Sequence, residues 1–102
     1  MTILEFQKLI EDIYFERDKA RGLEGSFRWF VEEVGELAKA LRNAASGETK
    51  ESAANLREEF ADVLAWLSTL ASIAEIDLES TAREKYAQGC PKCASTPCGC
   101  AP

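Results

Sequence analysis

Apolar residues recur every three or four positions through most of the chain, which is the spacing of helices that bury one face. The first such stretch follows Thr2, a residue type that favours a helix N-cap, and it fades near Arg21. Gly22 and Gly25 then predict a turn. The apolar positions of this first predicted helix are Leu4, Phe6, Leu9, Ile10, Ile13 and Tyr14.

Three further helices are expected after that turn. The second has Ser26 as its N-cap, runs to about residue 45 and ends at Ser46-Gly47; the third runs from about residue 51 to residue 76. A fourth, capped by Asp77, runs from residue 78 to about residue 87, and Gly89 stops it. The apolar stripes expected to be buried are Phe30, Val34, Leu37 and Leu41 on the second helix, and Leu56, Phe60, Val63, Leu64, Leu67 and Ala71 on the third.

No segment alternates apolar and polar residues over a useful length, so no strand is expected. The predicted fold class is therefore all-α, a helical bundle of about four helices. The bundle forms one domain over residues 1–88, and residues 89–102 form a short Cys-rich tail that carries all 4 Cys and all 3 Pro.

Composition narrows the class of protein. A chain of 102 residues fits one domain, but it buries only a modest core, which makes an oligomer plausible. The chain has 12 Lys+Arg against 18 Asp+Glu, a net charge of -6, which argues against a nucleic-acid partner and a polybasic membrane anchor. It has no His, so Ser-His and Cys-His nucleophile pairs and His metal ligands are excluded.

No targeting segment is expected, because the first residues turn acidic at Glu5 and lack a basic region followed by an apolar run. The longest apolar stretch, residues 63–74, contains Ser68, Thr69 and Ser72 and is shorter than the ~20 residues that span a bilayer. We therefore expect a cytoplasmic protein without a membrane partner.

Carboxylates cluster on the second and third predicted helices. The second carries Glu32-Glu33-Val34-Gly35-Glu36, and the third carries Glu58-Glu59-Phe60-Ala61-Asp62. Positions three and four apart share a helix face, so the carboxylates flank the apolar stripes beside Trp29 and Trp66. If the stripes pack together, Glu33, Glu36, Glu59 and Asp62 converge at the edge of the bundle.

A solvated acidic face is the alternative interpretation of these clusters. Two features weigh against it: Glu32 to Glu36 and Glu58 to Asp62 are like-charge pairs at i,i+4, and no Lys or Arg lies four residues after Glu33, Glu36, Glu59 or Asp62. Repulsion of this kind beside a core calls for a cation. Carboxylate oxygens without His or Cys suit a hard divalent ion, Mg²⁺ or Mn²⁺.

The pattern Glu32-Glu33-x-x-Glu36, 22 intervening residues, then Glu59-x-x-Asp62 resembles the EExxE…ExxD signature of the MazG-like all-α nucleoside triphosphate pyrophosphohydrolases. The resemblance covers about residues 1–87. It implies a helical bundle that assembles as a homodimer or a dimer of dimers. It also implies Mg²⁺-dependent cleavage of a nucleoside triphosphate between its α- and β-phosphates, which gives a nucleoside monophosphate and pyrophosphate.

Carried over to this chain, the resemblance makes Glu33, Glu36, Glu59 and Asp62 the metal ligands. Glu32 would then lie next to the ligands or orient the attacking water, and a carboxylate such as Glu32 or Glu33 would accept the proton in place of a His. The metal ions would neutralise the phosphates and lower the pKa of a bound water.

Candidates for binding the substrate follow from the same resemblance. Family members often have basic and polar side chains in the helix after the ExxD motif, where this chain has Arg83, Lys85 and Tyr86. Lys39 and Lys50 are weaker candidates. Trp66 and Trp29 can stack on a base, although packing is the commoner role of a Trp on a helix flank. Packing is also the role expected of Phe6, Leu9 and Tyr14.

The tail reads Cys90-Pro-Lys-Cys93-Ala-Ser-Thr-Pro-Cys98-Gly-Cys100, a CxxC followed by a CxC. Four thiolates can complete a closed tetrahedral Zn²⁺ site, and Pro and Gly help the chain turn around an ion. Disulfides, redox chemistry and a disordered metal-scavenging tail are the alternatives. The tail lies outside the core pattern of the family that the helices resemble.

Three functions compete at this stage. The first is a nucleotide pyrophosphohydrolase, and the second is a non-catalytic helical dimer that binds nucleotide or metal as a sensor or interaction module. The third is a zinc-dependent interaction protein whose acidic face is only solvated. Carboxylates at all four expected ligand positions favour the enzyme.

Overall fold

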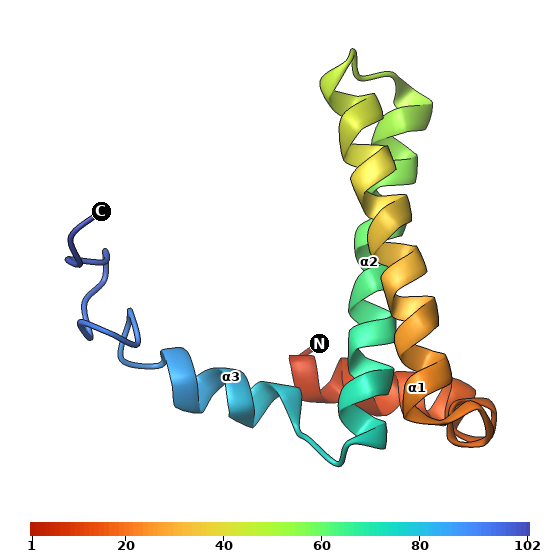
Figure 1. Ribbon diagram of the computed structural model, residues 1–102, viewed down its shortest axis with the longest axis horizontal. Coiled ribbons are helices and arrows are strands. Elements are labelled where there is room, and N and C mark those ends of the chain that lie inside the picture. Colours follow the sequence, from red (N-terminus) through yellow and green to blue (C-terminus); the bar gives the residue numbers. More distant parts are fainter.

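The computed structural model describes residues 1–102 and contains three helices and no strands: α1 (Ile3–Ala45), α2 (Lys50–Ile73) and α3 (Leu78–Tyr86). The prediction of an all-α fold is confirmed. The second part of α1 and the whole of α2 run antiparallel as a long hairpin (Figure 1). The first part of α1 crosses the end of this hairpin that lies away from the 46–49 link, which we call the foot of the hairpin. The α3 helix leads away from the foot and is followed by the C-terminal tail.

The chain bends within α1 at one residue. Gly22 has φ +78 and ψ 177, a conformation that side-chain-bearing residues rarely adopt. The predicted interruption is therefore present at Gly22, but it does not extend to Gly25, and the predicted N-cap at Ser26 is wrong, because helix resumes directly after Gly22. Ser26 is fully buried inside α1, and its hydroxyl accepts a hydrogen bond from Nη1 of Arg21 (3.4 Å) instead of capping a helix.

Gly25 does not form the turn that was predicted from the presence of a glycine; it makes room for a neighbouring side chain. A Cβ at this position would lie 2.7 Å from Cγ of Arg21, so only glycine leaves room for the Arg21 side chain to fold back along the bend. Because the interruption is a single residue, the first two predicted helices form one bent helix, α1, and the structure has three helices where about four were expected.

The remaining helix ends follow their capping residues. Thr2 and Thr49 each form a capping box, with Glu5 and Ser52 respectively. The α2 helix ends at Ile73, three residues before the predicted end, because the backbone turns at Glu75 (φ 60). Asp77 caps α3 as predicted and accepts a hydrogen bond from the backbone of Ser80 (3.1 Å).

A buried amide ties the two ends of the helical region together. The side chain of Gln7 donates hydrogen bonds to Oγ of Ser72 (3.1 Å) and to the carbonyl of Ile76 (2.8 Å). Its Oε1 accepts from the backbone N–H of Leu78 (3.0 Å). The start of α1 is thus fixed against the turn between α2 and α3.

The single chain has very little core. Only 8 of its 102 residues are buried, and the radius of gyration is 16.4 Å, where a compact chain of this length has about 13 Å. It exposes 7620 Å², whereas a compact monomer of 11.3 kDa exposes roughly 5,700 Å². The excess is about the area that one partner buries in an obligate protein–protein interface.

The predicted burial of the two apolar stripes is wrong for the isolated chain. Ala71 is buried, but Val34, Leu41, Phe60 and Leu64 are 41–54% exposed. The two helices of one hairpin cover only one side of each stripe, so the other side needs further protein against it.

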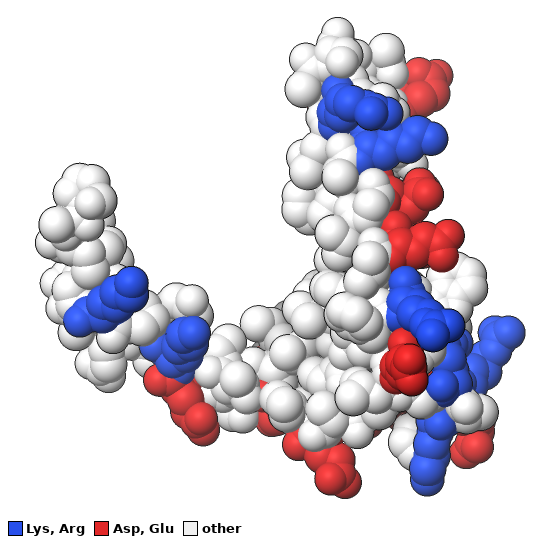
Figure 2. All heavy atoms as spheres, viewed as in Figure 1, with Lys and Arg blue, Asp and Glu red and all other residues white.

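Charge is distributed unevenly around the hairpin. Figure 2 shows Lys, Arg, Asp and Glu gathered along the edge of the hairpin that faces away from α3, and a largely uncharged surface on the side that faces α3. An apolar groove of about 720 Å³ opens between α1, α2 and α3. We call it the apolar groove; it is lined chiefly by Leu23, Phe27, Leu67, Leu70, Ile76 and Leu78. None of the helices has the length and apolarity that a membrane span requires.

Candidate functional site

Three of the predicted ligand carboxylates meet across the hairpin. One oxygen each from Glu33 on α1 and from Glu59 and Asp62 on α2 lies within 4.8 Å of the others. Glu33 and Asp62 are equally far along the chain from the middle of the 46–49 link. Since antiparallel helices rise equally per residue, they bring such positions to the same level. Glu59 lies one turn from Asp62 on the same face.

The acidic cluster is electrostatically uncompensated. Burial of the Glu33 carboxyl, followed by the charges of Asp62 and Glu59, raises the pKa of Glu33 above its usual range. Oε2 of Glu59 is buried and has no hydrogen-bond partner. The three ion pairs of the chain all lie elsewhere, at Asp18–Arg21, Glu24–Arg28 and Glu79–Arg83. A buried acceptor beside two further carboxylates and no basic side chain is a donor set that fits a divalent cation.

Glu36 and Glu32 lie next to this cluster without joining it. Glu36 is one turn beyond Glu33, and its charge contributes to the raised pKa of Glu33, so it lies near enough to interact. Both Glu36 and Glu32 are exposed, and neither is among the three carboxylates that converge.

The predicted phosphate-binding residues are not brought to the acidic cluster within one chain. Arg83, Lys85 and Tyr86 lie on α3, which runs away from the hairpin (Figure 1). Arg83 pairs with Glu79 (3.6 Å), and the Lys85 ammonium lies 5.7 Å from the centre of the Tyr86 ring. Lys39 is exposed on α1 and Lys50 is exposed at the start of α2, and neither has an ionic partner.

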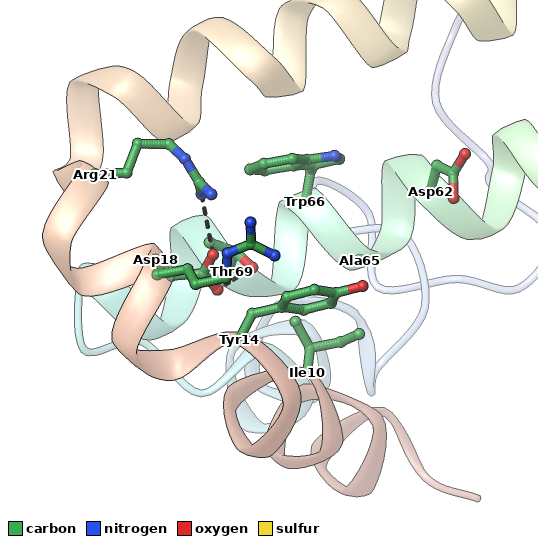
Figure 3. A pocket seen from close by; sticks show the side chains of 9 residues that line it. Ile10, Tyr14, Asp18, Arg21, Asp62, Ala65, Trp66 and Thr69 are labelled. Carbon is green, nitrogen blue, oxygen red and sulfur yellow. Dashed lines mark hydrogen bonds and ion pairs between the residues drawn. The ribbon is translucent and has the colours of Figure 1, made fainter.

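A pocket of about 260 Å³ opens beside Asp62, on the side of the acidic cluster toward the foot of the hairpin (Figure 3). Figure 3 shows the Tyr14 and Trp66 rings on two sides of it, with Arg21 and Asp18 at one end and Asp62 toward the other. The pocket is lined by Ile10, Tyr14, Arg17, Asp18, Arg21, Asp62, Ala65, Trp66 and Thr69. Tyr14, expected only to pack, is therefore a pocket residue that is 42% exposed.

Two other side chains lie against the Trp66 indole. Trp29 stacks against it with ring centres 6.0 Å apart and planes inclined by 9°. The Arg21 guanidinium carbon lies 4.9 Å from the centre of the Trp66 ring, within range of a cation–π interaction. Trp29 thus supports Trp66, and Trp66 itself faces the pocket.

Sequence reasoning missed the polar end of the pocket, formed by Asp18 and Arg21. Asp18 is only 8% exposed; it accepts hydrogen bonds from Nη1 of Arg21 (3.0 Å) and from Oγ1 of Thr69 (2.9 Å). The sequence does contain a signal that would place them on the pocket side of the helix, because residues 10, 14, 18 and 21 follow helical spacing from buried Ile10. It was overlooked because the polar run at 17–21 suggested the end of a helix.

The four thiols of the tail form a second cluster. The four Sγ atoms all lie within 4.8 Å of one another, so the group can hold a metal ion. A backbone N–H from Gly99 lowers the pKa of Cys93 to about 6, while hydrogen bonding among the thiols, chiefly with Cys98, raises the pKa of Cys100 to about 11.

Comparison with known families identifies the helical region. The family model of the MazG nucleotide pyrophosphohydrolase domain matches residues 21–94, which include the acidic cluster, Trp66 and α3. No curated protein matches the chain. Tyr14 and Asp18, on the first part of α1, lie before the matched segment.

Proposed function

The chain belongs to the MazG nucleotide pyrophosphohydrolase family, and we propose that it hydrolyses a ribo- or deoxyribonucleoside triphosphate to the monophosphate and pyrophosphate with Mg²⁺ or Mn²⁺. The observation that carries the proposal is the convergence of Glu33, Glu59 and Asp62 without a basic partner. The buried Glu59 oxygen without a hydrogen bond supports a ligand role, because buried polar atoms normally have a partner.

The proposed metal ligands are Glu33, Glu59 and Asp62, with Glu36 completing the set from one turn beyond Glu33. All four supply carboxylate oxygens, the donors that Mg²⁺ and Mn²⁺ prefer. When bound, the metal neutralises triphosphate charge, polarises the reacting phosphorus and lowers the pKa of water. Without that neutralisation, an acidic site would repel a triphosphate.

The chain's own carboxylates do the proton chemistry in this proposal. Water attacks the α-phosphorus, and the bond between that phosphorus and the oxygen bridging to the β-phosphate breaks, so pyrophosphate leaves. A carboxylate oxygen of Glu32 or Glu33 orients the water and accepts its proton, because the chain has no imidazole to serve as base.

The pocket between Tyr14 and Trp66 is the proposed site of the nucleoside. The aromatic side chains of Tyr14 and Trp66 suit a flat base, and Asp18 and Arg21 offer an acceptor and donors at one end of the pocket. Because Asp62 lines both this pocket and the acidic cluster, a base in the pocket would leave its phosphates beside the carboxylates.

The functional unit in this proposal is a homodimer or a dimer of dimers. The exposed area above that of a compact monomer, the half-exposed stripes and the apolar groove all support a second copy. A second copy would also supply Arg83, Lys85 or Tyr86 from its α3 to the phosphates, since α3 leads away from the acidic cluster of its own chain.

The test is a panel of ribo- and deoxyribonucleoside triphosphates incubated with the protein and Mg²⁺, Mn²⁺ or EDTA. The proposal predicts metal-dependent release of monophosphate and pyrophosphate in equal amounts, with one base preferred. Release of orthophosphate would contradict the cleavage position. Metal-dependent binding without turnover, seen by titration on the same sample, would instead favour the nucleotide sensor.

A further inference from the structure

The C-terminal tail, residues 89–102, takes no part in the proposed reaction and has no apolar core. It consists of Gly, Cys, Pro, Lys, Ala, Ser and Thr, and every residue in it is exposed or only half-buried. The tail is nevertheless folded into tight turns. Ala94 donates from its backbone to the carbonyl of Cys90 (2.7 Å), and Cys90 donates to the carbonyl of Ser95 (3.0 Å).

Those turns gather the four sulfurs at a specific spacing. Sγ of Cys90 lies 3.8 Å from Sγ of Cys100, and Sγ of Cys93 lies 4.0 Å from Sγ of Cys98. A disulfide would need about 2.05 Å. A tetrahedron with Zn–S bonds of ~2.3 Å has sulfurs ~3.8 Å apart, which matches both pairs.

The backbone around the sulfurs is arranged to favour thiolates. Gly99 donates its N–H to Sγ of Cys93 (3.2 Å), and Cys100 donates its N–H to Sγ of Cys98 (3.4 Å). Such donors orient thiolate ligands and stabilise their charge in metal sites. Gly89 has no room for a side chain, since a Cβ would lie 2.7 Å from the carbonyl oxygen of Ser95.

We propose that Cys90, Cys93, Cys98 and Cys100 bind one Zn²⁺ in a closed structural site. This site stabilises the fold of the tail, which follows α3 in the chain. Four protein thiolates leave no open coordination position, so the site has no catalytic role. Sulfurs this close surround a single ion and leave no space for an iron–sulfur cluster. Because the tail buries so little apolar surface, metal binding is the source of its folding free energy. The proposal does not depend on the pyrophosphohydrolase function.

The first test measures metal and thiols on the full chain purified under reducing conditions without chelator. We expect one zinc per chain by elemental analysis, released when the thiols are titrated with an organomercurial. A coloured protein with one iron per chain would overturn the choice of metal. Metal-free protein, with either four free thiols or two disulfides, would overturn the site.

Variants separate this site from the acidic cluster, which could also retain metal. The double variant Cys98→Ser/Cys100→Ser should lose the zinc while its helical circular dichroism stays that of the wild type. Lys92→Ala, an exposed change between two ligands, and Glu59→Gln should each keep one zinc per chain. Zinc retained by the Cys double variant, or lost from Glu59→Gln alone, would place the ion elsewhere and refute the proposal.

Limited proteolysis tests the structural role. Trypsin cuts after Lys92 only if the surrounding turn opens, so we expect slow cleavage there in the zinc-loaded protein and at least tenfold faster cleavage after the zinc is removed. Equal cleavage rates with and without zinc would show that the metal does not fold the tail.

Discussion

Thr69 donates a hydrogen bond of 2.9 Å from its Oγ1 to Oδ2 of Asp18, a residue 51 positions earlier in the chain. The other Asp18 oxygen accepts from Arg21 (3.0 Å), and Arg21 also reaches Ser26 on the far side of the bend. One buried carboxylate therefore joins both parts of α1 to α2 and shapes the end of the pocket.

This connection predicts a measurable loss of stability in Thr69→Val. The substitution keeps the shape of the side chain but leaves a buried carboxylate oxygen without its donor, which should cost about 1–3 kcal/mol. Urea unfolding measures it. The control is Arg28→Ala, because the Arg28–Glu24 pair is exposed and should contribute less than about 0.5 kcal/mol. Equal effects of the two changes would contradict a structural role for the Asp18–Thr69 bond.

Two glycines of α1 predict stability changes of opposite sign. Gly22→Ala should destabilise by about 1 kcal/mol or more, because Gly22 has a positive φ. Gly35→Ala should stabilise by about 0.5–1 kcal/mol, because Gly35 is in regular helix with open space where a Cβ would lie. Thermal unfolding of both variants without metal tests the pair, and stabilisation by Gly22→Ala would contradict the bend.

The acidic cluster predicts that Mg²⁺ stabilises the protein. The melting temperature should rise with Mg²⁺ in the wild type, because the ion binds the folded chain and relieves repulsion among the carboxylates. Glu33→Gln should raise the melting temperature in EDTA, since it removes one of the repelling charges, and should lose most of the shift with Mg²⁺. Glu58→Gln, a change outside the cluster, should keep the wild-type shift. A full Mg²⁺ shift in Glu33→Gln would count against the assignment of ligands.

The exposed apolar surface predicts a dimer or tetramer in solution. Phe27 lines the apolar groove and is 54% exposed, so Phe27→Glu should place a charge in the interface and shift the mass toward that of a monomer. Asn43→Glu introduces the same charge at an exposed residue of α1 that does not line the groove and should leave the mass unchanged. Sedimentation velocity distinguishes the two. A monomeric wild-type protein at micromolar concentration would contradict the proposed assembly.

The pocket predicts a role for an aromatic ring outside the acidic cluster. Tyr14→Ala should raise KM for the preferred triphosphate about tenfold, because losing a ring contact costs about 1–1.5 kcal/mol. Phe15→Ala is the control, since Phe15 is an exposed neighbour that does not line this pocket. Unchanged KM in Tyr14→Ala would move the nucleoside elsewhere.

Features set by local spacing were predictable from the sequence, and features set by distant contacts were not. The capping residues Thr2 and Asp77 act on their own helices, and both were identified correctly. The meeting of Glu33 with Asp62 follows from two helices and a short link. Ser26 was misread because its preference for N-caps was outweighed by burial against Arg21, which depends on the single-residue bend at Gly22.

The burial of side chains was harder to predict from the sequence than the formation of helices. The apolar stripes were identified, but Phe60 and Leu64 are exposed in the single chain. Helical spacing reveals an apolar face and does not say what covers it, so their exposure could not be predicted. The pocket was missed for a related reason. Asp18 and Arg21 are charged residues of the kind found at a solvated helix end, and only their contacts with Thr69 and Trp66 on α2 show that they line a pocket.

The most direct test of the proposed function compares pyrophosphate release by the wild type, Glu59→Gln and Glu58→Gln with Mg²⁺ and the preferred triphosphate. Glu59 contributes the buried oxygen without a partner, and Glu58 is its exposed neighbour outside the cluster. We predict that Glu59→Gln lowers turnover more than about a hundredfold, while Glu58→Gln stays close to the wild type. Turnover by Glu59→Gln equal to that of Glu58→Gln would contradict a metal-dependent reaction at this cluster.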